Sequence, residues 1–504
     1  MGGTLMNCRP IAFGLSFFLI LGELAPLEAQ RRDSRFGKSL QTRVNPRHER
    51  IKTEANQAYQ KADYQKVVRL TTSVLLENPR DHVSFYLRGS ARVEIGLRQG
   101  DGELIRKGIS DAREAIRFAR NQNPLYYIPY LYGMTNLASV ENRKEHAEVA
   151  LQQASSALAL PALEDEPKSH LLFQRGKTHA YLKNYDDAAS DFESAIRLNK
   201  AHLGANLGLS EAYAASGKKL KALESYAESV DSFPDNPLVY NNRGMYPQQQ
   251  GNLPKAILDF TRAVEIDPQY YFSYTNRGFA LMVFGDPKAA EADYTTSLQI
   301  NPNQPVVYNL RGSSRLAQGK VKPAIQDQTQ VVRLVPRDPF AHADLGFAKF
   351  FAEDYTGAQK SFEQAVSLND KLRHLGPWQY CAMNFSEQSE AAKNKFEAIL
   401  KKGPALRDWI DNLVVYLMGE IGDQDLLNVV GPQNEQVKAA QLCEAHFFIG
   451  LRKMRAGEKE AAEKHFQHAL DTKATHLAAF RGTQFALKKF AVAGARSSSF
   501  NPQN

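Results

Sequence analysis

The chain has few of the residues that cross-link small folds. It contains only three cysteines and two tryptophans in 504 residues. Cys8 lies near the start, while Cys381 and Cys443 fall far apart in stretches with helical periodicity. We therefore predict two packed cysteines rather than a disulfide, so the fold does not depend on covalent cross-links.

Motifs of common reaction centres are missing too. The sequence has no phosphate-binding glycine loop, no His-Glu-x-x-His, no paired Cys-x-x-Cys and no Gly-x-Ser-x-Gly. His465 and His468 have a spacing that lets two side chains of one helix share a metal, but spacing indicates no third ligand. We interpret them as surface histidines. We expect no metal, no cofactor and no enzymatic activity, since a catalytic site would have to be assembled across distant segments.

Long hydrophobic runs are also scarce. The one candidate, residues 11–22, follows Arg9 and precedes a small-residue stretch that ends at Ala29. This order is typical of a secretory signal peptide, so we predict that residues 1–29 direct export to the periplasm or the extracellular space. A retained anchor is the alternative, although the run is short for a membrane span. No later segment is predicted to span a membrane.

Negative charge is sparse in the segment that follows. The chain carries a formal net charge of +8. Within residues 30–47 a single acidic residue, Asp33, faces six basic ones: Arg31, Arg32, Arg35, Lys38, Arg43 and Arg47. We predict a disordered leader here; the alternative is an electrostatic contact with an anionic envelope surface. Residues 491–504 are likewise predicted to form a disordered tail.

What the sequence does contain is a 34-residue period. Small residues recur at this interval: Gly176, Ser210, Gly244, Gly278, Gly312 and Gly346. An alanine follows each after twelve residues: Ala188, Ala222, Ala256, Ala290, Ala324 and Ala358. An aromatic residue follows after sixteen in all but one case: Phe192, Tyr226, Phe260, Tyr294 and Phe362, with Gln328 as the exception. Each unit holds two helical stretches around a polar turn, and such a unit buries its apolar face only by stacking on copies of itself.

This pattern resembles the tetratricopeptide repeat. Six uninterrupted units cover residues 169–372, and looser units cover 48–161 and 373–490, the last ending in a capping helix. The resemblance implies an all-α, right-handed solenoid of about eleven helix-turn-helix units. Residues 443–470 are similar to the terminal repeats of bacterial cell-envelope repeat proteins.

Arginine and aspartate occur together within the units. In five units an arginine directly precedes the small residue. The same five units have an aspartate three residues after the position that alanine usually occupies. The pairs are Arg88 with Asp111, Arg175 with Asp191, Arg243 with Asp259, Arg277 with Asp293, and Arg311 with Asp327. Units without the arginine have Leu209 with Ser225 and Leu345 with Ser361. We predict a bidentate ion pair that bridges the two helices of a hairpin. Because each arginine is matched, we expect no nucleic-acid partner.

The resemblance implies that first helices line an inner wall at positions 2, 5, 6, 9, 12 and 13 of each unit. Over units 237–372 these positions combine amides with apolar side chains, which suit an extended peptide and its anchors. The predicted partner-binding residues are Asn241, Asn242, Met245, Phe272, Asn276, Phe279, Asn309, Phe340 and Phe347. Alternatively, the aromatic rings pack between helices.

Pro247 is predicted to kink its first helix or to end it near Tyr246.

The resulting hypothesis is a non-catalytic interaction scaffold or adaptor of the cell envelope that binds a protein or peptide segment on its concave face. One alternative is a protein that binds cell-wall polymer or other carbohydrate. Another is an accessory subunit of an envelope enzyme. Repeats of this kind serve many unrelated partners, so the sequence does not name one.

Overall fold

The structure is a computed structural model that describes residues 45–161, 163–402, 407–431, 434–475 and 477–498. Over these ranges it consists of helices, with no strand. None of the described helices is both long enough and apolar enough to cross a bilayer. The predicted signal peptide and the predicted basic leader up to residue 44 lie outside the described residues.

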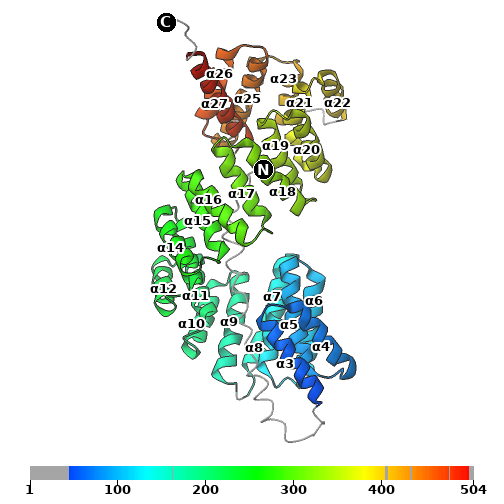
Figure 1. Ribbon diagram of the computed structural model, residues 1–504, viewed down its shortest axis with the longest axis vertical. Coiled ribbons are helices and arrows are strands. Elements are labelled where there is room, and N and C mark those ends of the chain that lie inside the picture. Colours follow the sequence, from blue (N-terminus) through cyan, green and yellow to red (C-terminus); the bar gives the residue numbers. More distant parts are fainter. Residues whose placement is uncertain (1–44, 162, 403–406, 432–433, 476, 499–504) are drawn as a thin grey trace. The chain divides into compact units, whose positions relative to one another are not determined.

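The described chain forms two compact units, residues 45–246 and residues 247–498, which we call the N-terminal unit and the C-terminal unit. In the N-terminal unit, helices follow one another as antiparallel pairs (Figure 1). They are α3 (Pro46–Gln60), α4 (Tyr64–Glu77), α5 (His82–Gln99), α6 (Gly102–Phe118), η1 (Pro124–Tyr126), α7 (Tyr127–Glu141), α8 (Lys144–Leu158), α9 (Asp165–Tyr181), α10 (Tyr185–Leu198), α11 (Leu203–Ala215) and α12 (Lys219–Ser232).

Helix α13 (Pro237–Gln249) spans the boundary between the units, and the remaining helices belong to the C-terminal unit. They are α14 (Leu253–Ile266), α15 (Tyr271–Phe284), α16 (Pro287–Ile300), α17 (Pro305–Ala317), α18 (Val321–Leu334), α19 (Pro339–Phe351), α20 (Tyr355–Leu368), η2 (Asp370–Leu375), α21 (Gly376–Phe385), α22 (Ser389–Lys402), α23 (Trp409–Met418), α24 (Asp423–Asn428), α25 (Glu435–Arg455), α26 (Lys459–Asp471) and α27 (Ala478–Ser498). The repeated helical hairpins agree with the predicted all-α solenoid fold.

Local sequence explains how each hairpin turns. Between α15 and α16, Gly285 adopts a left-handed conformation with φ of 98°, which glycine reaches without steric cost. The carboxylate of Asp286 then accepts a hydrogen bond from the Ala289 backbone at 3.0 Å, and Pro287 occupies the first turn of α16. A C-terminal glycine, a capping side chain and a first-turn proline together stop one helix and start the next.

The periodic small residues lie where the two helices of a hairpin approach most closely. A methyl group added to Gly176 would lie 2.7 Å from the ring of Phe192, which is fully buried. The same relation holds for Gly278 with Tyr294 and for Gly346 with Phe362. The aromatic side chain therefore fills the space that the glycine leaves open, as ridge-into-groove packing requires.

The arginine–aspartate contacts within the hairpins have the predicted bidentate geometry. Arg175 donates from Nε and Nη2 to the two carboxylate oxygens of Asp191 at 2.8 and 2.6 Å. Equivalent contacts join Arg88 to Asp111, Arg277 to Asp293 and Arg311 to Asp327. Arg243 and Asp259 belong to different units, and their pairing stays a prediction.

The structure adds a second role for these arginines. Nη1 of Arg277 donates to Thr261 on the second helix of the preceding hairpin, at 3.2 Å. Arg88 and Arg311 reach Thr72 and Thr295 in the same way, at 3.3 Å. Each of these arginines therefore joins three helices. In one of the two hairpins that have leucine and serine in place of the pair, Ser210 and Ser225 form a hydrogen bond of 2.8 Å.

Three boundaries differ from the prediction. Helix α13 continues through Pro247 to Gln249, so the predicted alternative of an end near Tyr246 is wrong, while a kink at Pro247 stays a prediction. Helix α27 extends to Ser498, so the tail predicted from residue 491 is helical over most of its length. A short additional pair, α23 and α24, fills the stretch between residues 407 and 431, where the repeat pattern is lost.

Candidate functional site

The first helices of the N-terminal unit carry polar side chains at the positions that the resemblance assigns to the inner wall. We call this set the N-terminal wall; it consists of Tyr59, Glu94, His170, Gln174, Lys177, Glu211 and Asn242. All are buried or largely buried. Polar groups rarely occupy buried positions without partners, so such a concentration calls for an explanation.

Lys177 on α9 is the centre of the N-terminal wall. Its ammonium interacts electrostatically with Glu94 on α5 and with Glu211 on α11. Nζ lies 4.9 Å from the ring centroid of Tyr132 on α7, a cation–π distance. Lys177 therefore contacts the neighbouring first helix α7 and interacts electrostatically with α5 and α11, while its side chain is only 7% exposed.

Burial shifts the titration of this group of charges. It lowers the pKa of Lys177 to about 8, against the attraction of the two glutamates. It raises the pKa of Glu211 to about 7, against the attraction of Lys177, because its carboxylate is desolvated. The pKa of Glu94 is also raised by burial, while Arg98 and Lys177 oppose the shift. Low-dielectric surroundings therefore outweigh the mutual attraction of these charges.

Several polar atoms of the N-terminal wall have no hydrogen-bond partner among the described residues. They are the Tyr59 hydroxyl, Oε2 of Glu94, Nδ1 of His170 and Oε1 of Gln174. An unsatisfied buried polar group costs about 1–3 kcal/mol. The four atoms lie on three of the first helices, α3, α5 and α9.

The three predicted residues of α13 are buried, and their role in partner binding stays a prediction. Asn241, Asn242 and Met245 are each less than 7% exposed, comparable to Glu94 and Lys177 of the N-terminal wall. Asn242 donates to the carboxylate of Glu211 at 3.2 Å. Asn241 contacts Asn242 and the Met245 sulfur at 3.4 and 3.8 Å. These amides hydrogen-bond neighbouring side chains, which the spacing of the residues did not indicate.

Sequence reasoning missed Lys177 and Glu211, although a signal was available. Both occupy position 9 of their units, one of the predicted wall positions. The prediction placed the wall on units 237–372, where amides and aromatics are densest, and so gave no weight to single charges in 169–236. Two opposite charges at the same position of adjacent repeats would have been the signal.

The other six predicted residues lie in the C-terminal unit, and we call them the C-terminal wall: Phe272, Asn276, Phe279, Asn309, Phe340 and Phe347. Only Phe340 is clearly exposed, at 47%. Phe279 packs partly against the core residues Tyr294 and Leu298. Phe347 makes edge-on contacts with Phe362 and Trp378. The alternative that such rings pack between helices therefore holds for Phe347 and in part for Phe279.

Asn309 is engaged within the C-terminal unit. Its amide donates to Asp344 at 3.0 Å and accepts from Gln328 at 2.9 Å. Burial raises the pKa of Asp344 to about 6, and the charge of Arg481 together with the Asn309 hydrogen bond opposes the shift. Gln328 is the one exception in the aromatic series, so the missing ring is replaced by a polar contact.

Helix α27 lies against wall positions of the C-terminal unit. Phe485 stacks on Phe351 of α19 with ring centroids 5.1 Å apart. A methyl group on Gly482 would lie 2.6 Å from Phe447 of α25. Lys488 donates to the Ala317 carbonyl at the end of α17, at 3.2 Å. The terminal helix therefore covers part of the surface that the repeat pattern assigns to a partner.

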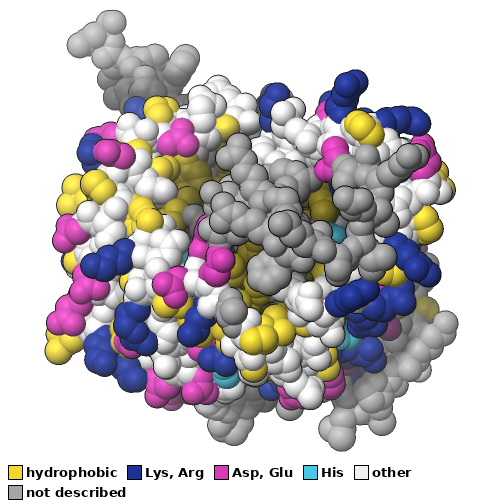
Figure 2. Space-filling model, turned by 90° about the horizontal axis from the view of Figure 1, so that it is seen from below, with side chains coloured by type: hydrophobic (Ala, Val, Ile, Leu, Met, Phe, Trp, Pro, Cys, Tyr) yellow, Lys and Arg dark blue, Asp and Glu magenta, His cyan; other side chains and the backbone are white. Residues whose placement is uncertain are grey.

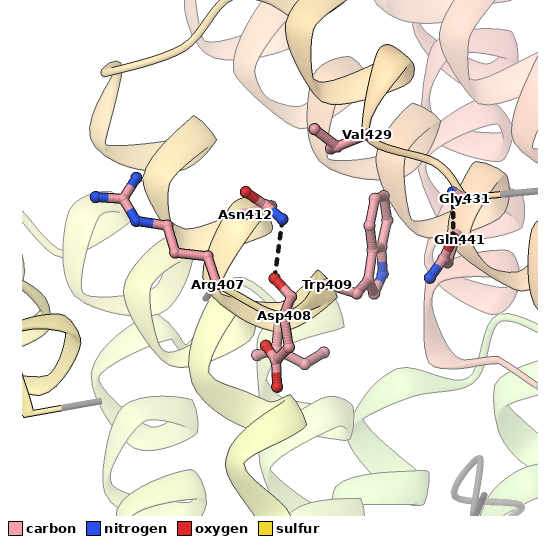
Figure 3. A pocket seen from close by; sticks show the side chains of 8 residues that line it. Arg407, Asp408, Trp409, Asn412, Val429, Gly431 and Gln441 are labelled. Carbon is pink, nitrogen blue, oxygen red and sulfur yellow. Dashed lines mark hydrogen bonds between the residues drawn. The ribbon is translucent and has the colours of Figure 1, made fainter. Parts of the chain in front are cut away.

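A pocket of about 430 Å³ opens in the C-terminal unit beside Trp409 (Figure 3). Figure 3 shows Trp409 beside Val429 and facing Gly431 and Gln441. The indole donates to Glu444 at 2.7 Å, and burial raises the pKa of Glu444 to about 7. The described lining contains no nucleophile next to a base and no pair of carboxylates, so it has no recognisable catalytic arrangement.

The surface and the cysteines complete the survey. On the face displayed in Figure 2, basic and acidic side chains are interspersed rather than gathered into a field of one sign. Cys381 and Cys443 are free thiols buried in the core, as predicted. Burial raises the pKa of Cys443 to about 12, so this thiol is inert.

Comparisons with known proteins agree with the repeat assignment. Residues 173–237 match a family model described as tetratricopeptide repeat. No curated protein matches the chain. Similar solved structures include pilF of Pseudomonas aeruginosa, at 19% identity over 41% of this chain and 94% of that chain, with a TM-score of 0.36.

Two further solved structures are similar to the chain at comparable identity. A tetratricopeptide repeat protein from Parabacteroides merdae is 18% identical over 52% of this chain and 98% of that chain, with a TM-score of 0.35. YrrB, described as a TPR protein with an unusual peptide-binding site, is 17% identical over 36% and 94%, with a TM-score of 0.32. Likeness at this level carries no information about a partner.

Proposed function

We propose that the protein is a non-catalytic scaffold of the cell envelope that binds a protein or an extended peptide on the first helices of its N-terminal unit. Proteins built from tetratricopeptide repeats generally mediate protein–protein interactions, and the match over residues 173–237 covers the hairpin that carries Lys177. The observation that carries the proposal is the row of buried polar atoms without partners on α3, α5 and α9.

An extended peptide suits this surface chemically. Its backbone offers one donor and one acceptor per residue, which match the Gln174 amide, the Tyr59 hydroxyl and the Glu94 carboxylate. Lys177 and the glutamates would select charged side chains of either sign at fixed places. A stacked scaffold holds these groups in place before binding, which lowers the entropy cost of association.

The experiment is quantitative affinity capture from an envelope extract with matched charge variants. Glu94→Gln and Lys177→Met each remove one charge of the N-terminal wall while nearly keeping side-chain size. Glu148→Gln makes the same change at an exposed position of α8 and serves as the control. We expect the wall variants to lose the same captured proteins, and the control to retain them. Identical captured sets for all variants would contradict the proposal.

The envelope assignment is a separate part of the proposal. It rests on the apolar run of residues 11–22 and the small-residue stretch that ends at Ala29. We expect fractionated cells to hold the protein in the periplasm or the medium, with a mature chain that begins at Gln30. A full-length chain in the cytoplasm would contradict export and would leave the binding proposal intact.

The alternative of a wall-polymer or carbohydrate-binding protein rests on the basic leader and the exposed ring of Phe340. Co-sedimentation with purified wall polymer distinguishes the two functions, because a scaffold that binds only peptides should not sediment with the polymer. An accessory subunit of an envelope enzyme would instead be recognised by an enzyme among the captured proteins.

A further inference from the structure

Three histidines converge on the outer part of the hairpin formed by α25 and α26. His465 and His468 are one helical turn apart on α26, so they project from the same face. His446 projects from α25 and meets them. The sequence indicated only the first two, and the structure corrects the interpretation of isolated surface histidines by supplying the third.

The distances suit a common ligand. One ring nitrogen from each histidine lies within 4.8 Å of the others. Nδ1 of His446 and Nδ1 of His465 are 3.0 Å apart. In a tetrahedral zinc site with Zn–N bonds of about 2.0–2.1 Å, two ligand nitrogens are roughly 3.3 Å apart. The first pair is close to this spacing, and His468 is exposed, so neighbouring side chains leave its ring room to turn towards a bound metal.

We propose that His446, His465 and His468 form a binding site for a divalent transition-metal ion of the zinc type. Imidazole nitrogen is a preferred ligand of such ions, and three protein ligands leave a fourth position open for water or for a group of a bound molecule. The short His446–His465 contact is a hydrogen bond in which one Nδ1 carries a proton, and the metal takes the place of that proton.

Packing between α25 and α26 holds the proposed site in place. Gly450 on α25 packs directly on the ring of Phe466, which stands next to His465 on α26. This contact fixes the register of the two helices and therefore the relative positions of His446 and His465.

The contacts of neighbouring side chains show which of them are available as further metal ligands. Asp423 exerts an attraction on His465, but its two oxygens are engaged by the Tyr416 hydroxyl at 2.7 Å and by Lys453 at 3.3 Å. We therefore do not count Asp423 among the metal ligands. Cys443 lies one turn before His446 but is fully buried in the core, so the thiol is not part of the set.

The test is zinc titration of the full chain, purified without a histidine tag and stripped with a chelator. We expect one Zn²⁺ per chain by calorimetry. Replacing His468 by glutamine should weaken binding at least about tenfold, since one of three protein ligands is lost. His468 is exposed, so the fold of this variant should be unchanged by circular dichroism. His342→Gln, on α19 and remote in sequence, is the matched control and should bind as the wild type does.

Cobalt gives a second readout. Co²⁺ bound by the three imidazoles should show the visible absorption of a four-coordinate site in the wild type and in His342→Gln. The absorption should disappear in a His446→Gln, His465→Gln, His468→Gln triple variant. Zinc binding of equal stoichiometry and affinity in the wild type and the triple variant would overturn the proposal, as would the absence of binding by the wild type.

Discussion

The two units build their inner walls in opposite ways. In the N-terminal unit, first helices bring Glu94, Lys177 and Glu211 together, and several polar atoms there lack partners among the described residues. In the C-terminal unit, the corresponding positions are filled by aromatic packing and by helix α27. The wall positions thus carry buried charged and polar side chains in the N-terminal unit and mostly aromatic side chains in the C-terminal unit.

This difference follows from what each unit must bury. The C-terminal unit contains degenerate repeats, whose hairpins stack less regularly, and a large aromatic cluster around Trp378 takes over the role of the regular contacts. Both units contain the regular contacts between glycine and aromatic residues and between arginine and aspartate, for example Gly176 with Phe192 and Gly278 with Tyr294. The difference therefore lies in the residues at the wall positions, which are charged around Lys177 and mostly aromatic in the C-terminal unit.

The largest effect is expected where the C-terminal unit packs most densely. Trp378 is 3% exposed and contacts the rings of Phe347, Phe350 and Phe447. Trp378→Ala should lower the free energy of unfolding by about 3–5 kcal/mol, through lost burial and a large cavity. Chemical denaturation measures this loss.

Phe340→Ala serves as the control for the same unit, because this ring is 47% exposed. Its cost should stay within about 0.5 kcal/mol, as for an ordinary surface substitution. Equal losses for the two variants would show that Trp378 is not the centre of the cluster.

The second prediction compares ion pairs in the two units. Asp327 in the C-terminal unit binds both Arg311 and Arg315, at 2.7 and 2.8 Å. Asp327→Ala leaves the part-buried Arg311 without its carboxylate and takes one of two carboxylate partners from Arg315, which keeps Glu291 at 2.8 Å. The loss should cost roughly 3 kcal/mol. Asp191 in the N-terminal unit binds Arg175, with His179 farther away at 3.9 Å. Its loss should cost about 1–3 kcal/mol.

Urea unfolding of both alanine variants measures the difference, with exposed Asp231→Ala on α12 as the control. The order Asp327, Asp191, Asp231 is the expected result. A larger loss of stability for Asp191→Ala than for Asp327→Ala would mean that Arg315 adds nothing to the stability of the ion pairs around Asp327.

The third prediction concerns the pH dependence of the N-terminal wall. The pKa of Glu211 is raised to about 7, so the folded state binds a proton that the unfolded state releases above about pH 4.5. Its stabilising contribution is therefore fully present below the unfolded pKa and is lost as the pH rises towards 7.

Glu211→Gln removes this dependence while keeping an acceptor for Asn242. Relative to the wild type, the variant should gain about 1–3 kcal/mol between pH 5 and pH 8. Thermal melts at the two pH values measure the gain. A difference between variant and wild type that is independent of pH would contradict the desolvation of this carboxylate.

The smallest expected effect concerns the C-terminal wall as a binding surface. From the sequence, the loss of both Phe272 and Phe279 is predicted to weaken partner capture about tenfold, roughly 1.4 kcal/mol. In the structure both rings are half-buried, and Phe279 packs on a core cluster. The double alanine variant should therefore lose less than about tenfold, and less than Lys177→Met.

Binding isotherms with a captured partner, together with thermal melts, measure both variants. The melts show whether a loss of binding reflects unfolding. A larger loss for the phenylalanine variant at unchanged stability would move the binding surface to the C-terminal wall.

Features within a single repeat were predictable. The pairing of Arg175 with Asp191, and the packing of Phe192 on Gly176, join residues that are sixteen positions apart and recur with the period. Because both residues of such a pair recur in several units, the sequence indicates each kind of contact more than once. The reach of Arg277 to Thr261 in the preceding hairpin is also spaced by sixteen residues but has fewer copies, so it was missed.

The sequence by itself determined the helical hairpins, their stacking period and their internal ion pairs, because each is a local rule that the chain repeats. Only the tertiary structure decided which side chains share a surface. Lys177 with Tyr132, Phe485 with Phe351 and His446 with His465 are contacts between residues of unrelated position in the period. Their partners are set by how successive hairpins pack and where the last helix turns back, and no local pattern in the chain records that geometry.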